Sequence, residues 1–87
     1  MGIEFKGSAD RHGIPREDTL HAMMNAEATA TVPGYPGETT TVYVGHPHAQ
    51  TDRYLDVIAA THPPHGVVIF HSMPLTDVYR HLLHERK

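Results

Sequence analysis

The stretch VVIFHSMPLTDVYRHLLHE, residues 67–85, passes from an apolar strand into an amphipathic helix. Residues 67–73 are apolar on both faces, which is typical of a central strand of a sheet. Pro74 occupies a position that the start of a helix tolerates. The helix then repeats apolar side chains at i, i+3, i+4, i+7 and i+8, namely Leu75, Val78, Tyr79, Leu82 and Leu83. This order predicts a C-terminal helix that folds back on a sheet.

Upstream of this stretch, three segments have the alternating pattern of strands. The first two, ATATV at 28–32 and TTTVYVG at 39–45, flank the turn-forming run PGYPGE at 33–38 and predict a hairpin. The third, RYLDVIAAT at 53–61, follows a break in the pattern at 45–50. Together with the strand from residue 67, these segments predict an antiparallel meander of about four strands.

The N-terminal part predicts a short strand and then helices. IEF at 3–5 suits the strand, and Ser8 suits the start of a helical turn that reaches His12. Pro15 suits the first turn of a longer helix over residues 15–26. The apolar side chains of this helix are expected to face the core, and they are Leu20, Met23 and Met24.

These elements predict a single α+β domain over residues 1–87. It consists of a twisted antiparallel sheet of about four strands with N-terminal helices and a C-terminal helix, all on one side of the sheet. A chain of 87 residues has room for one core, and because it has no cysteine its stability must come from packing.

Composition limits the function classes. No apolar stretch approaches the roughly 20 residues of a membrane helix, so we expect a soluble cytoplasmic protein that does not contact a membrane. The formal net charge of −3 argues against a surface built mainly to hold phosphates. The 9 histidines could reverse that charge below a pH of about 6.5.

Three segments of the sequence resemble the BrnT-like branch of the RelE/ParE toxin superfamily. The matching segments are IEF at 3–5, RHGI at 11–14 followed by PREDTL at 15–20, and VVIFHSMPLTDVYRHL at 67–82. This resemblance implies the toxin of a type II toxin–antitoxin system, which inhibits translation by cleaving RNA or ribosome-bound mRNA. It also implies a cognate antitoxin as partner, and an assembly that is either a homo-oligomer or a toxin–antitoxin hetero-oligomer. One departure is SMPLT at 72–76, where BrnT-like chains usually carry arginine and lysine.

Cleavage of RNA by its own 2′-hydroxyl needs a base, an acid and a cation near the phosphate, but neither a metal nor another cofactor. His71 is the leading candidate because it ends a strand that can hold it rigidly. Arg53 opens the neighbouring strand, and the next helix carries a tyrosine and an exposed arginine. We therefore expect a catalytic site made of His71, Arg80, Arg53 and Tyr79. Arg11 and His12 match the basic residue and the histidine of a short family motif, in which lysine or arginine is followed by His-Gly and an aliphatic residue. This match implies that Arg11 and His12 contact RNA.

Two alternatives stay open. The first is a non-enzymatic binding module that keeps the toxin scaffold, which the acidic net charge favours. The second is a histidine-based metal protein, in which two histidine pairs supply imidazole ligands: His46 with His48, and His81 with His84. No acidic residue is marked as a further ligand, so we expect no metal.

Overall fold

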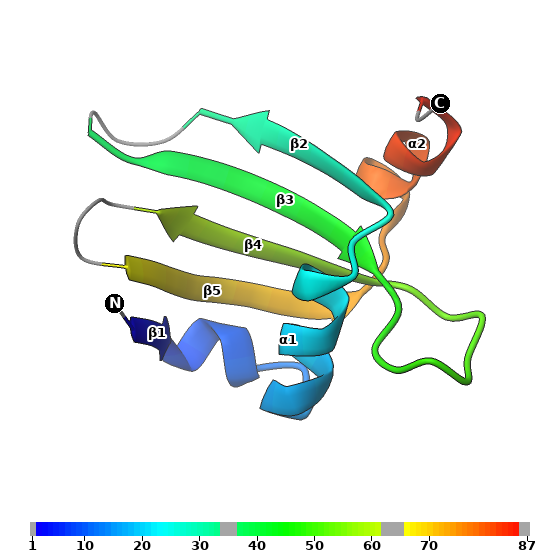
Figure 1. Ribbon diagram of the computed structural model, residues 1–87, viewed down its shortest axis with the longest axis horizontal. Coiled ribbons are helices and arrows are strands. Elements are labelled where there is room, and N and C mark those ends of the chain that lie inside the picture. Colours follow the sequence, from blue (N-terminus) through cyan, green and yellow to red (C-terminus); the bar gives the residue numbers. More distant parts are fainter. Residues whose placement is uncertain (1, 34–36, 62–65, 86–87) are drawn as a thin grey trace.

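The computed structural model describes residues 2–33, 37–61 and 66–85, without the side chains of residues 78, 84 and 85. Its elements in chain order are β1 (Gly2–Phe5), the short 3-10 helix η1 (Gly7–Asp10), α1 (Arg16–Met24), β2 (Ala28–Val32), β3 (Thr39–Gly45), β4 (Leu55–Thr61), β5 (Gly66–Pro74) and α2 (Asp77–Glu85) (Figure 1). The predicted hairpin strands, the two later strands and both main helices are confirmed. The side chain of Val78 and part of the turn at 33–38 lie outside the described residues. No helix in the described ranges is long and apolar enough to span a membrane.

All five strands form one sheet in the order β1-β5-β4-β3-β2. Strands β2 to β5 make the predicted antiparallel meander, whereas β1 runs parallel to β5, with Gly2 opposite Gly66. The sheet is therefore five-stranded and mixed, which corrects the prediction of about four antiparallel strands. The two backbones can approach closely because residue 66 is a glycine with φ +106. A Cβ there would lie 2.4 Å from the carbonyl oxygen of Gly2.

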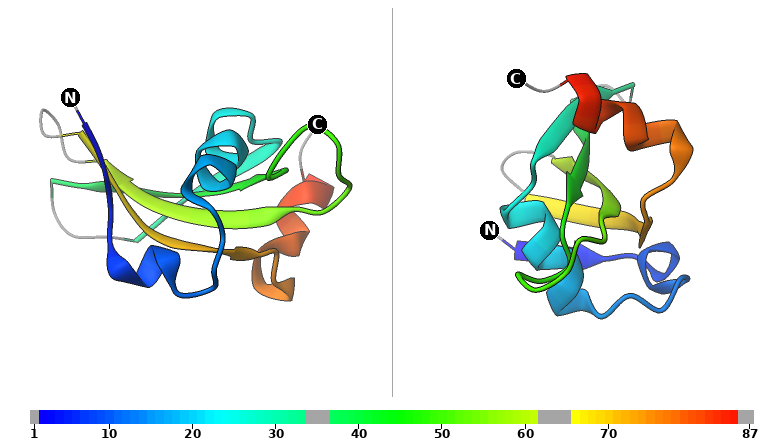
Figure 2. Two further views of the ribbon diagram at one scale, coloured as in Figure 1. Left: turned by 90° about the horizontal axis from the view of Figure 1, so that it is seen from below. Right: turned by 90° about the vertical axis from the view of Figure 1, so that its right-hand side faces the viewer.

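The two helices cover opposite faces of the sheet, as the left view of Figure 2 shows. Val57 and Ile58 are neighbours in β4, but Val57 packs in the core under α1 and Ile58 in the core under α2. Neighbouring residues of a strand point to opposite faces, so the two cores are separated by the sheet. The expectation of helices on one side is wrong, because the central strands are apolar on both faces and each face needs a cover. We call the two sides the α1 face and the α2 face.

The helix α1 contacts the sheet through small side chains. Thr19 and Ala22 are 1% and 0% exposed, whereas Met24 is 81% exposed. The prediction that Met24 faces the core is therefore wrong, while the other two predicted apolar residues of α1 do pack against the core. The helix lies too close to β3 for a long side chain at the contact. A Cβ at Gly45 would lie 2.3 Å from the carbonyl oxygen of Ala22.

We expect the substitution Gly45→Ala to lower the free energy of unfolding by about 2 kcal/mol, because overpacking of a tight contact costs about 1–3 kcal/mol. Urea unfolding followed by circular dichroism measures this change. Gly7→Ala is the matched control, since a Cβ at Gly7 meets no atom within 4 Å. The control should change the free energy by less than about 0.5 kcal/mol. Equal losses in both variants would contradict the close contact between α1 and β3.

Candidate functional site

A bulge in β5 places two neighbouring side chains on the same face of the sheet. Ile58 of β4 is opposite His71, but the next residue, Ala59, is opposite Ile69, so Phe70 is the extra residue. Ile69 packs in the core under α1, which directs Phe70 to the α2 face. His71 is opposite Ile58 and therefore lies on the α2 face as well. The hydroxyl of Ser8 donates a hydrogen bond to the carbonyl oxygen of Phe70 at 2.6 Å and satisfies the backbone at the bulge.

The imidazole of His71 is held by the carboxylate of Asp56, which is 0% exposed. His71 Nε2 lies 2.5 Å from Asp56 Oδ1. The other oxygen, Oδ2, accepts hydrogen bonds from the backbone N–H and the hydroxyl of Thr76, both at 3.1 Å. Because a carboxylate can only accept, Nε2 carries a proton and the lone pair of the neutral ring is on Nδ1. Among the described residues, no group is bonded to that Nδ1.

The same carboxylate connects three elements. Asp56 is on β4, His71 is on β5, and Thr76 precedes α2 and caps it. The carbonyl oxygen of Thr76 accepts hydrogen bonds from the backbone N–H groups of Tyr79 at 3.2 Å and Arg80 at 3.0 Å. An anionic group at the start of a helix also interacts favourably with the helix dipole. Asp56 therefore sets both the orientation of His71 and the position at which α2 begins.

A second imidazole lies beside the first. The rings of His12 and His71 are edge to face, with their centroids 6.3 Å apart. The side chain of His71 is 26% exposed and His12 is exposed, so a substrate in solution can reach both. Two imidazoles at this distance, one of them oriented by a buried carboxylate, can act as a general acid and a general base on one substrate.

An ion pair between Asp10 and Arg16 joins the two ends of the segment that carries His12. The guanidinium of Arg16 donates two hydrogen bonds to the carboxylate of Asp10, at 3.2 and 2.8 Å. The guanidinium also lies 4.7 Å from the centre of the Phe5 ring. These contacts bring the end of η1 and the start of α1 together on either side of His12. The hydrogen bond from Arg16 lowers the pKa of Asp10 below its ordinary value of 3.8.

The structure brings the other predicted site residues together only in part. Arg53 and Arg80 line one pocket of about 270 Å³ near the start of α2, and Arg80 also pairs with Asp77 at 3.2 Å. Tyr79 is half-buried in the core under α2. Within the described residues, no hydrogen bond or ion pair connects His71 with these three. Arg11 is exposed next to His12. The catalytic and RNA-binding roles of all six residues remain predictions.

A separate cluster surrounds His46. Its Nε2 lies 3.0 Å from a carboxylate oxygen of Glu27, and its Nδ1 lies 2.7 Å from the carbonyl oxygen of Arg53. The ring stacks on Tyr54 at 4.1 Å, and the Tyr54 hydroxyl donates to Glu27 at 2.9 Å. Both ring nitrogens of His46 therefore already face protein oxygens.

This cluster bears on the metal alternative. The pair of His46 and His48 has no free ring nitrogen at its first member, and His48 Nδ1 accepts the backbone N–H of Gln50 at 3.3 Å. The second pair includes His84, whose side chain lies outside the described residues. Within the described ranges, no three histidine, cysteine, aspartate or glutamate side chains are grouped as metal ligands.

Asp56 is the residue of this site that the sequence reasoning missed. Its signal is present in the printed sequence, because it is a charged residue between Leu55 and Val57 in an otherwise apolar strand. Such an acid is seldom fully buried without a partner. The identity of that partner, 15 residues away in the chain, depends on the pairing of β4 with β5.

No protein family, curated protein or solved structure that was compared with the chain matches it.

We expect the substitution Arg16→Gln to raise the pKa of Asp10 toward 3.8, because the hydrogen bonds and the positive charge that favour the carboxylate are lost. A carboxyl with a lowered folded-state pKa stabilises the fold above its unfolded-state pKa. That contribution is lost as the pH falls from about 3.8 through the lower folded value. An NMR titration of the Asp10 carboxyl measures the shift. Arg11→Gln removes a neighbouring exposed arginine and should leave Asp10 unchanged; an equal shift in this control would contradict the specific pair.

Proposed function

We propose that this protein is a metal-independent endoribonuclease of the toxin type, with His71 and His12 as its base and acid. The observation that supports this most strongly is the hydrogen bond between His71 Nε2 and the buried carboxylate of Asp56. This bond orients the imidazole and directs its lone pair to Nδ1, while a second imidazole lies 6.3 Å away. The resemblance to BrnT-like toxins of the RelE/ParE superfamily supports the same reaction class.

The reaction uses the 2′-hydroxyl of the RNA as nucleophile. His71 Nδ1 accepts the proton of this hydroxyl while the 2′-oxygen forms a bond to the adjacent phosphorus. The bond from phosphorus to the 5′-oxygen breaks, and that oxygen takes a proton from the imidazolium of His12. The products are a 2′,3′-cyclic phosphate and a 5′-hydroxyl. Asp56 acts as a positioning residue, because it contacts His71 and not the RNA.

The basic side chains have separate roles in this proposal. Arg11 is exposed and adjacent to His12, and it is assigned to the phosphate at the cleavage site. Arg53 and Arg80 share a pocket and are assigned to a phosphate further along the strand. The catalytic role predicted for Tyr79 is not used in this mechanism, in which the two histidines supply the base and the acid; the ring of Tyr79 packs in the core under α2. With a net charge of −3, RNA affinity must come from these local groups rather than from the whole surface.

As a toxin, the protein would stop growth when produced alone and would be neutralised by a cognate antitoxin. We expect production in bacteria to arrest growth and to deplete intact mRNA, and we expect His71→Ala to relieve the arrest. Growth and mRNA length measured side by side test this. If cells grow normally with abundant folded protein, the non-enzymatic binding module becomes the better interpretation.

In purified form, we expect the chain to cleave single-stranded RNA in the presence of EDTA and to leave a 2′,3′-cyclic phosphate. His71→Ala and His12→Ala should each lower the rate by about 100-fold or more, because each removes one general acid–base group. Mass spectrometry of the cleaved ends identifies the product, and initial rates measure the loss.

His81→Ala is the matched control, since it removes an exposed histidine of α2 by the same substitution and should keep the full rate. All variants are purified in parallel, so that a contaminating ribonuclease would appear in every preparation. A rate that is equal in wild type, His71→Ala and His12→Ala would refute the assignment of both residues.

A further inference from the structure

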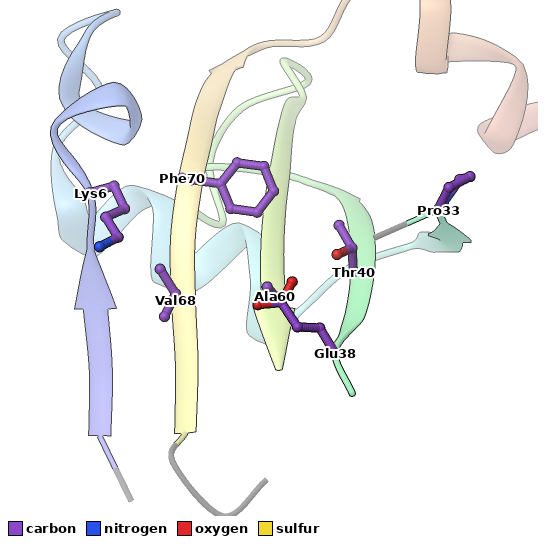
Figure 3. A pocket seen from close by; sticks show the side chains of 7 residues that line it. All are labelled: Lys6, Pro33, Glu38, Thr40, Ala60, Val68 and Phe70. Atoms are coloured by element: carbon purple, nitrogen blue, oxygen red, sulfur yellow. The ribbon is translucent and has the colours of Figure 1, made fainter. Parts of the chain in front are cut away.

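A pocket of about 500 Å³ opens on the α2 face, and no described residue of α2 lines it. Val68 and Phe70 of β5 and Ala60 of β4 form its apolar part, as Figure 3 shows. The ring of Phe70 extends from β5 toward β4 in this view. Lys6 and Glu38 are at opposite sides of the pocket. The pocket has the size of a small-molecule site and an aromatic ring as its largest surface.

The bulge in β5 places His71 next to a residue that lines this pocket, Phe70, and on the same face of the sheet. Phe70 and His71 are consecutive, so their Cα atoms are about 3.8 Å apart, and both side chains are on the α2 face. In a regular strand they would point to opposite faces, and a group bound on Phe70 would be separated from His71 by the sheet. With the bulge, one ligand can contact the ring of Phe70 and the imidazole of His71 at the same time.

We infer that this pocket holds a nucleobase of the RNA, stacked on Phe70, next to the phosphate that is cleaved at His71. This inference rests on the proposed function, which it extends by a binding site for the substrate. Phe70 is partly exposed on a sheet face that α2 leaves open, and unpaired bases stack on aromatic rings of this kind. Stacking tolerates any base, so the contact holds single-stranded RNA in place without selecting a sequence.

Lys6 adds the charge that a phosphate at the pocket requires. Its ammonium pairs with Glu4 at 3.1 Å, but the two side chains are 56% and 60% exposed. An exposed pair of this kind is weak, and the flexible lysine side chain can exchange Glu4 for a phosphate oxygen. A base on Phe70 therefore has histidines on one side and a cation on another. A partner protein bound in the same pocket would not require the imidazoles of His71 and His12, whereas cleavage of a bound RNA does.

The test uses a short oligodeoxynucleotide with a single ribonucleotide, because only that ribose can supply the 2′-hydroxyl and the cleavage position is then known. A matched oligonucleotide with deoxyribose at the same place cannot be cleaved and reports binding alone, by fluorescence anisotropy. We expect Phe70→Leu to weaken binding of this probe about tenfold, and Phe70→Tyr, which keeps a stacking ring, to retain it. Tyr43→Leu removes an aromatic ring from the α1 face and should leave binding unchanged.

Abasic probes identify the contact directly. Removal of the base on one side of the marked position should cost wild type about tenfold in affinity, and Phe70→Leu should then cause no further loss. Circular dichroism melts show that each variant is folded. If Phe70→Leu weakens intact and abasic probes equally, or if wild type binds no probe, the inference is wrong.

If the proposed ribonuclease function is wrong but the nucleobase site is right, a different set of results is expected. In that case the ribonucleotide probe stays intact with wild type, while the coupling between Phe70 and the base persists. If instead Phe70→Leu changes only the oligomeric state measured by light scattering, the pocket binds another copy of the chain and the inference is overturned.

Discussion

The fully buried carboxylate of Asp56 is the group on which the rest of the structure depends. A buried carboxylate without hydrogen-bond donors is strongly destabilising, so each donor must stay in place. The donors come from β5 and from the residue that caps α2, and the carboxylate is on β4. One polar group thus determines where α2 begins and how His71 is oriented. The same contacts that stabilise the fold orient the imidazole that we propose as catalytic base, so the proposal couples stability and activity at Asp56.

The two helices contact different strands of the sheet and leave different parts of its two faces open. On one face, α1 approaches so closely that Ala22 meets the backbone at Gly45, which leaves no space for a ligand between this part of the helix and β3. On the other face, α2 covers β2 and β3 and leaves the far ends of β4 and β5 open. The histidine pair and the pocket at Phe70 both lie on this partly covered face. A single extra residue in β5 brings them next to each other.

Much of the fold could be predicted because the type of each helix or strand follows from the pattern of apolar residues within a short segment of sequence. The periodicity of residues 67–85 predicts β5 and α2, and the alternation at 28–32, 39–45 and 53–61 predicts the meander. The parallel pairing of β1 with β5 could not be predicted in this way, because it joins segments more than 60 residues apart. The prediction for Met24 is wrong for a related reason, since periodicity indicates an apolar stripe on a helix but not the distance between that helix and the sheet. Small residues face the sheet at this contact, and they carry little hydrophobic signal.

The sequence by itself determined the type and order of the elements, and it singled out His71 at the end of an apolar strand and, through the resemblance at RHGI, Arg11 and His12 as RNA contacts. Only the tertiary structure decided that these two rings meet, that Asp56 lies behind one of them, and that Arg53 and Arg80 share a different pocket. The physical reason is that element type follows from contacts within a few residues. The site depends instead on strand register and on one bulge, and a shift of one residue in register would turn His71 to the opposite face.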